Sequence, residues 1–173
     1  MNRAIRFGLF FLIPIVIVVD QWSKWLVLNE PRLNALDCLH VPQRCGQIEL
    51  SPVFDLTMVW NRGVSFGTMQ SDGPMRWVLV ALTLTIAIGF AIWLVRANRR
   101  WTALALALVV GGAIGNVIDR VRFGAVVDFF DFSGLYFIWV FNVADAAISV
   151  GAVLLFVDQF LMSRREASQE AET

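Results

Sequence analysis

Four long apolar stretches constrain the fold of this 173-residue chain more than any other feature of its sequence. They cover residues 7–28, 77–95, 102–118 and 138–156. At a rise of about 1.5 Å per residue, each can cross a hydrocarbon layer of about 30 Å as a helix. Hydrophobic residues make up 58% of the chain and charged residues only 16%, which is typical of membrane proteins. We therefore expect a mainly α-helical integral membrane protein, with a bundle of four transmembrane helices in a single domain over residues 1–173.

The first apolar stretch has two interpretations. Arg3 and Arg6 precede it, as basic residues precede the apolar core of a cleavable signal peptide. No small-x-small cleavage site follows, however, and the stretch continues past Asp20 to Leu28. We therefore expect a retained helix, kinked at Pro14 because proline removes one backbone hydrogen bond.

The arginines in short segments predict the orientation of the bundle. An even number of crossings places three such segments on one side, and they contain Arg3, Arg6, Arg96, Arg99, Arg100, Arg164 and Arg165. The opposite side also carries seven cations, but on longer loops, where each charge has less weight. We expect the side with both termini to be cytoplasmic.

Between the first two apolar stretches, a β region is expected at about 48–72. Partial alternation around Phe54 and Trp60 predicts short strands that form a small extracytoplasmic sheet at the membrane surface. Cys38 and Cys45 lie nearby, and the spacing allows either a disulfide or two unpaired thiols. After the fourth helix, which we expect to end near residue 161, the polar tail 163–173 is expected to be disordered.

Composition excludes several classes of function. Fourteen Lys and Arg balance fourteen Asp and Glu, so the chain lacks the basic excess that binding to nucleic acid requires. His40 is the only histidine and there are only two cysteines, which cannot supply a Cys/His metal cluster or a Ser-His-Asp triad. We expect no metal and no cofactor.

Polar residues inside the spans are costly, and here they gather at one predicted depth. With the orientation given above, they lie near the outer leaflet, at the outer ends of the first, third and fourth helices. They are Asp20, Lys24, Asn116, Asp119, Arg120, Asn142 and Asp145.

The sequence Asn-Val-x-Asp occurs twice, at 116–119 and at 142–145. Three-residue spacing places each amide on the same helical face as its carboxylate, so Asp119 and Asp145 can face each other. Two close carboxyl groups tend to share one proton, which allows one to activate water while the other hydrogen-bonds a peptide carbonyl. Alternatively, Asp119 pairs with a neighbouring cation and Asp145 stabilises a helix end. Because the same Asn-Val-x-Asp pattern occurs twice, we favour the interpretation in which Asp119 and Asp145 act together as an acid pair.

Two further groups are expected to be structural. Asp128 and Asp131 lie in the predicted loop 123–137, where we expect them to be solvated or to fold the loop. Lys24, the only lysine, could activate a serine, but Ser23 points elsewhere on a helix. An ion pair between Lys24 and Asp20, four residues apart, is the favoured interpretation.

Five blocks in order along the chain resemble those of the lipoprotein signal peptidases, or signal peptidase II, which are intramembrane aspartic proteases. The blocks begin with Asp20-Gln21-x-x-Lys24 and Asn61-Arg62-Gly63-Val64-Ser65-Phe66. The third runs from Gly111 to Arg120, and the last two are Val126-Val127-Asp128-Phe129 and Phe141-Asn142-Val143-Ala144-Asp145. The family usually has alanine where Ser65 stands and a shorter loop than 29–49.

The resemblance implies a function and a site. It implies that Asp119 and Asp145 are catalytic, and that other residues of the blocks bind substrate or shape the site, namely Asn61, Gly63, Asn116, Arg120, Asn142, Asp20 and Lys24. The implied substrate is a prolipoprotein, cut before a cysteine that carries a diacylglyceryl group. Membrane lipid is then a further partner, and we expect a monomer.

The competing hypothesis is a small transporter or proton channel that uses the same polar groups as a relay. A relay has to cross the whole bilayer. The stretch 77–95 contains no ionisable residue, and the predicted inner halves of the other spans are almost wholly apolar. The distribution of polar residues therefore favours the enzyme.

Overall fold

Four long helices dominate the structure, a computed structural model that describes residues 8–34, 44–63 and 74–170. They are α2 (Leu12–Leu28), α4 (Pro74–Arg96), α5 (Arg100–Phe123) and α6 (Val143–Glu170). All four lie in helical segments that are long and apolar enough to cross a membrane, the first of which begins at Gly8. The expected membrane-spanning bundle is confirmed.

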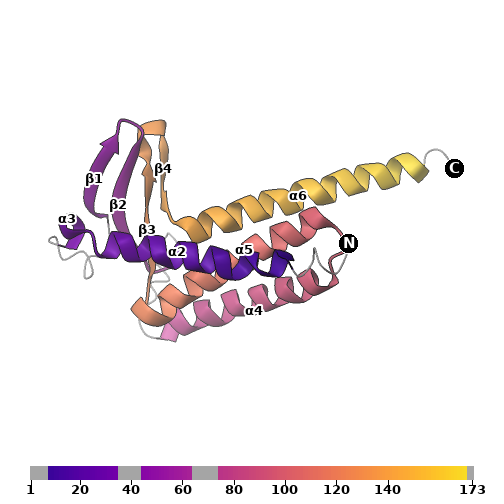
Figure 1. Ribbon diagram of the computed structural model, residues 1–173, viewed down its shortest axis with the longest axis horizontal. Helices are drawn as coiled ribbons and strands as arrows, with labels where there is room; N and C mark the ends of the chain where they lie inside the picture. The colour runs from indigo at the N-terminus through magenta and orange to yellow at the C-terminus, as the bar shows by residue number, and fades with distance from the viewer. Residues whose placement is uncertain (1–7, 35–43, 64–73, 171–173) are drawn as a thin grey trace.

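Helix α5 occupies the centre of the bundle, in contact with α2, α4 and α6 (Figure 1). Most of its apolar stretch is buried against these helices, whereas the other three expose most of theirs. Glycines allow the close contact with α6, since a Cβ atom on Gly112 would collide with the carbonyl oxygen of Ala144, and one on Gly151 would lie 2.7 Å from that of Ala105. Small residues at such crossings let two helix backbones approach each other.

The predicted ends of the first three spans agree with the helices to within a few residues. Phe11, three residues before Pro14, forms a turn but keeps helical dihedral angles, and the helical segment runs from Gly8 to Leu28. The kink at Pro14 stays a prediction. Helix α5 extends beyond the predicted end at 118 and stops where Gly124 adopts a left-handed conformation with φ 81°. Glycine is the usual residue at such a helix end.

The fourth span differs from the prediction at both ends. Residues Phe137–Phe141 form strand β4, and α6 begins only at Val143. An apolar run of aromatic and β-branched residues suits a strand as well as a helix, so hydrophobicity alone placed the start too early. At the other end α6 continues to Glu170, so the tail predicted to be disordered from 163 is helical as far as the structure describes it.

The sheet is antiparallel with the order β1-β2-β3-β4. Strands β1 (Cys45–Ser51) and β2 (Phe54–Asn61) lie in or beside the predicted β region. Residues 64–72 of that region fall outside the described part of the chain, and so do Cys38 and His40. Residues Val126–Phe132 form strand β3, so the prediction of a loop at 123–137 is wrong. A short α3 (Pro31–Asn34) precedes the sheet.

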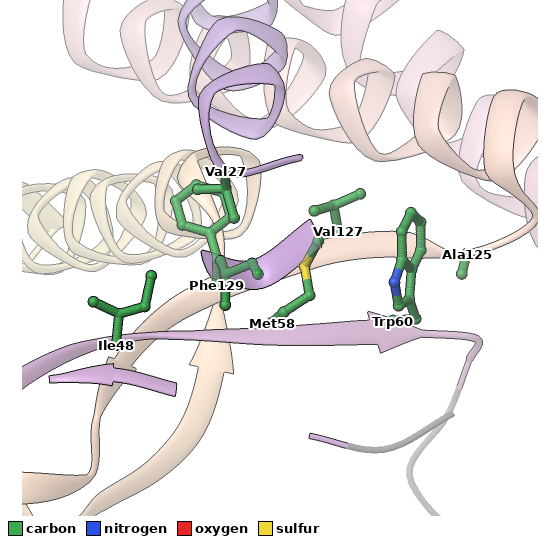
Figure 2. Packing of buried hydrophobic residues seen from close by; sticks show 8 residues of the cluster. Val27, Ile48, Met58, Trp60, Ala125, Val127 and Phe129 are labelled. Atoms are coloured by element: carbon green, nitrogen blue, oxygen red, sulfur yellow. The ribbon is translucent and has the colours of Figure 1, made fainter. Parts of the chain in front are cut away.

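A small apolar core attaches the sheet to the bundle. Met58 and Trp60 from β2 and Val127 and Phe129 from β3 lie on the side of the sheet that faces Val27, near the end of α2 (Figure 2). The sheet therefore sits at one end of the bundle, whereas the turn between α4 and α5 and the end of α6 lie at the other end (Figure 1). Both α5 and α2 end beside the sheet, and α6 begins there.

Candidate active site

The structure brings the predicted polar residues together at the sheet end of the bundle. Those from α2 and α5 come from the predicted helices, Asn142 and Asp145 lie at the start of α6, and two side chains from the sheet join them. The set comprises Asp20 and Lys24 from α2, Asn116, Asp119 and Arg120 from α5, Asn142 and Asp145 at the start of α6, Asn61 from β2 and Asp128 from β3.

Lys24 forms the centre of a buried ionic group. Its side chain is 2% exposed, and its Nζ lies 2.8 Å from Oδ2 of Asp20 and 2.7 Å from Oδ2 of Asp119. It also donates a hydrogen bond of 3.3 Å to Oδ1 of Asn116. The predicted ion pair between Asp20 and Lys24 is therefore present, and Asp119 shares the same lysine.

Asp119 and Asp20 also hold backbone groups of neighbouring elements. Oδ2 of Asp119 accepts a hydrogen bond from the backbone N–H of Val127 at 3.2 Å, and Oδ1 of Asp20 accepts one from that of Ala144 at 2.9 Å. Gln21 donates to Oδ1 of Asp119 at 2.8 Å. Both carboxylates are fully buried, and each of their oxygens has at least one polar partner.

Asn142 caps α6. Its Oδ1 accepts the backbone N–H of Asp145, three residues on, at 2.9 Å, which is the geometry of a helix N-cap. The spacing Asn-x-x-Asp therefore marks a helix start here, and Asn142 precedes α6, whereas the predicted span 138–156 placed it inside the fourth helix. Asp145 lies in the first turn of α6, where the helix dipole favours a negative charge.

Asp145 is half-buried and lies beside two amide side chains. Its Oδ1 accepts a hydrogen bond of 2.7 Å from Nδ2 of Asn116, and its backbone is fixed by the cap. This carboxylate is the one in the cluster that combines defined hydrogen bonds with partial exposure.

Asp128 is buried, 2% exposed, and the prediction that it is solvated in a loop is wrong. Its two oxygens accept hydrogen bonds from Nδ2 of Asn142 at 2.6 Å and from Nδ2 of Asn61 at 3.0 Å. Burial and the nearby charge of Asp145 raise the pKa of Asp128 from 3.8 to about 7, although the two amide hydrogen bonds act in the opposite direction. The sequence feature that could have identified Asp128 as buried is its position within a run of valine and phenylalanine.

Asp131 holds the neighbouring backbone in place, which is one of the two roles predicted for it. Its oxygens accept hydrogen bonds from Oγ1 of Thr57 at 2.7 Å and from the backbone N–H of Ser133 at 2.9 Å. It is buried, however, and not solvated. Asp131 thus ties β3 to β2 and to the turn before β4.

Two further residues predicted for the site, Gly63 and Arg120, lie near Asp128 and Asp145. Gly63 donates its backbone N–H to Oδ1 of Asn61 at 3.1 Å, which orients that amide towards Asp128. The guanidinium of Arg120 donates a hydrogen bond of 3.5 Å to the backbone oxygen of Asn116 and lies within electrostatic reach of Asp145, Asp128 and Asp119. Ser65 lies outside the described residues.

Asp119 and Asp145 have different partners in the structure, and Asn142 links Asp145 to a third acid, Asp128. The sequence predicts that Asp119 faces Asp145, but the oxygens of Asp119 are taken by Lys24, Gln21 and Val127. Asp128 instead shares Asn142 with Asp145 and responds to its charge. The arrangement provides two carboxyl groups with one readily held proton, which suits hydrolysis by an activated water.

A family model described as signal peptidase (SPase) II matches residues 12–161. The chain belongs to the signal peptidase II family. It is an aspartic peptidase family, so the resemblance stated from the five blocks is confirmed.

Relatives and solved structures agree with this membership. A lipoprotein signal peptidase of Caulobacter vibrioides is 41% identical over 159 residues, which cover 91% of this chain and 89% of the relative. One from Methylorubrum extorquens is 42% identical over 170 residues, covering 96% and 93%. A bacterial membrane enzyme solved by the in meso method at 2.3 Å resolution has the same fold, with a TM-score of 0.74, 22% identity and coverage of 90% and 89%.

The raised pKa of Asp128 predicts a pH dependence of the stability of this signal peptidase II chain. The folded protein holds a proton on Asp128 that the unfolded chain loses near its ordinary pKa of 3.8. The contribution of Asp128 to the free energy of unfolding should therefore fall as the pH rises from about 4 to about 7. Above pH 7 it should change little. Thermal unfolding in detergent, for wild type and Asp128→Asn across this range, measures it. Parallel curves for the two proteins would contradict the assignment.

Proposed function

We propose that this protein removes signal peptides from diacylglyceryl-modified prolipoproteins by cutting before the lipid-bearing cysteine. Membership of the signal peptidase II family and the names of the relatives support the reaction and the substrate class. The observation that carries the mechanism is the half-buried Asp145 beside Asp128, a carboxyl group with a pKa of about 7.

We infer that Asp128 and Asp145 are the acting pair. Asp119, the predicted partner of Asp145, is fully buried and bonded to Lys24, so it has neither an accessible oxygen nor a free charge with which to activate water. Asp128 comes from the fourth sequence block and lies against Asp145 through Asn142. This proposal replaces Asp119 with Asp128 and keeps Asp145.

The two acids then have different tasks. Asp145, in the first turn of α6, acts as the base and takes a proton from a water molecule as that water attacks the scissile carbonyl carbon. Asp128 retains a proton and donates a hydrogen bond to the carbonyl oxygen, which stabilises the tetrahedral intermediate. Asp145 then transfers the proton that it took from water to the leaving amine as the C–N bond breaks, which completes hydrolysis without a covalent intermediate and returns both acids to their starting states. Asn61, Gly63, Asn116, Arg120 and Asn142 orient the acids or hold the substrate.

We place the sheet and the acid pair at the outer leaflet, with both termini in the cytoplasm. The arginines of the short segments support this orientation, because such segments are enriched in positive charge on the cytoplasmic side. A substrate with two acyl chains would then enter sideways from the outer leaflet and reach Asp145 from its exposed side. The proposed enzyme acts as a monomer in the bacterial inner membrane.

The distribution of charge argues against a polar relay. A second buried ionic group does exist, where Asp158 of α6 pairs with Arg99 and Thr102 at the other end of the bundle. Between the two groups, α5 from Ala103 to Gly115 carries no ionisable residue. Protons or ions would have to cross this apolar segment, so the enzyme is the better supported function.

Removal of the lipid from the precursor tests the proposed substrate. We expect the purified protein to cut a diacylglyceryl-modified prolipoprotein at least about 100-fold more efficiently, as kcat/KM, than the same precursor without the lipid. Burial of only four methylene groups at about 0.8 kcal/mol each accounts for a ratio of this size. The precursor is purified before and after enzymatic lipidation, and a Cys→Ser precursor exposed to the same lipidation treatment is the control. Equal kcat/KM values for lipidated and unlipidated forms would refute the substrate class without refuting the peptidase.

A further inference from the structure

Lys24 connects Asp20 and Asp119, two acids that have no part in the proposed reaction. Nζ of Lys24 lies 2.8 Å from Asp20 and 2.7 Å from Asp119. Each of these carboxylates also accepts one backbone N–H from another element: Asp119 from Val127, and Asp20 from Ala144.

The two N–H groups belong to the residues directly before the proposed reactive acids. Val127 precedes Asp128 on β3, and Ala144 precedes Asp145 on α6. Lys24 is therefore connected to each reactive acid through one carboxylate, one hydrogen bond and one peptide unit. All three ionic side chains are at most 2% exposed, so water does not replace these contacts.

We propose that Lys24 is a positioning residue that sets the separation of Asp128 and Asp145 from its place on α2. The proposal rests on the proposed function, because it takes these two acids as the reacting groups. Lys24 itself touches neither the water nor the peptide. It holds strand β3 and the start of α6 at a fixed spacing through Asp119 and Asp20.

Electrostatics explains why the positive charge is needed for this task. Asp20 and Asp119 are two buried carboxylates that share one cation, and without it their mutual repulsion would drive them apart. Movement of the two carboxylates would lengthen their hydrogen bonds to Val127 and Ala144. Displacement of a reacting group by about 1 Å can lower a rate by about 100-fold.

The alternative is an ion pair that only stabilises the fold, and the chain offers a matched control for it. Asp158 is also buried, with Nη2 of Arg99 at 2.7 Å and Oγ1 of Thr102 at 2.5 Å. It lies thirteen positions after Asp145 on α6 (158 − 145), about 20 Å along the helix axis. Loss of this pair should affect stability without changing the acid pair.

The test compares kcat and KM for one lipidated precursor among wild type, Lys24→Met and Asp158→Asn, each normalised to the folded fraction in detergent. For Lys24→Met we expect kcat to fall about 100-fold with KM changed less than about threefold. For Asp158→Asn we expect a lower unfolding midpoint and wild-type kcat. A milder variant, Asp20→Asn, retains an oxygen for Ala144 but weakens the link to Lys24, and should lower kcat about tenfold.

Two results would overturn the proposal. One is a wild-type kcat per folded molecule in Lys24→Met, or in Asp20→Asn if Lys24→Met does not fold. The other is a rise in KM without a fall in kcat, which would make Lys24 a substrate-binding residue. The proposed function fails on different evidence, namely full turnover after replacement of Asp128 or Asp145, so the two failures are distinguishable.

Discussion

Asp128→Asn and Asp145→Asn should each lower kcat for a lipidated precursor by at least about 100-fold. Asparagine at position 145 cannot take a proton from water or return one to the leaving amine, and general acid–base catalysis of this kind contributes about 10² to 10⁴ in rate. Asparagine at position 128 lacks the acidic O–H that stabilises the developing charge on the carbonyl oxygen, and loss of one such donor costs about 10² to 10³ in rate. Both substitutions nearly preserve side-chain volume, so the proteins should remain folded. A gel-shift assay of precursor cleavage, with the folded fraction determined for each variant, measures the effect.

Asp119→Asn is the matched comparison, because it is the same substitution in the acid that the sequence predicts to be catalytic. Its amide oxygen can still accept the N–H of Val127, so we expect a fall in kcat of only about tenfold. If Asp119→Asn is inactive while Asp128→Asn cleaves at the wild-type rate, the pair predicted from the sequence is correct and our proposed pair is wrong.

Gly112→Ala should destabilise the bundle severely. The added methyl group would collide with the carbonyl oxygen of Ala144, a rigid backbone atom at the start of α6. Either α6 moves away from α5 or the backbone bends, and overpacking of this kind costs about 1 to 3 kcal/mol or more. Because Ala144 adjoins Asp145, cleavage should be lost as well. The yield of monodisperse protein and its unfolding midpoint in detergent are the measurements.

Gly89→Ala is the control for the Gly112 substitution. A Cβ atom at Gly89 on α4 would meet nothing within 4 Å, and alanine is favoured over glycine in a helix by about 1 kcal/mol. We expect an unchanged or raised midpoint and normal cleavage. If Gly112→Ala also matched wild type in midpoint and cleavage, α5 and α6 would not pack as closely as described.

Hydropathy was sufficient to predict the bundle, because the length and apolarity of a span are local properties of the sequence. It could not locate the start of α6, since the residues of β4 are as apolar as those of a span. Strand β3 was missed for a related reason. Its valines and phenylalanines become recognisable as a strand only once β2 and β4 pair with it.

The polar cluster was predicted as a set, but its pairings were not. Burial cost is enough to predict that Asp20, Lys24, Asp119 and Asp145 gather together. Which carboxylate meets which donor depends on tertiary contacts, such as that between Asp119 and Val127. The repeated Asn-Val-x-Asp suggested two equivalent acids, whereas one copy lies within a helix and the other caps one.

The burial of α5 has a consequence for biogenesis. When this helix enters the bilayer during synthesis, the surface at Gly112 and the Nδ2 group of Asn116 lack their partners until α6 has been translated and inserted. A nascent chain that stops before α6 would present polar groups to lipid tails, and such a fragment would be a natural target for membrane quality-control proteases. Arrival of the last helix thus completes assembly of the protein and its reactive centre in one step.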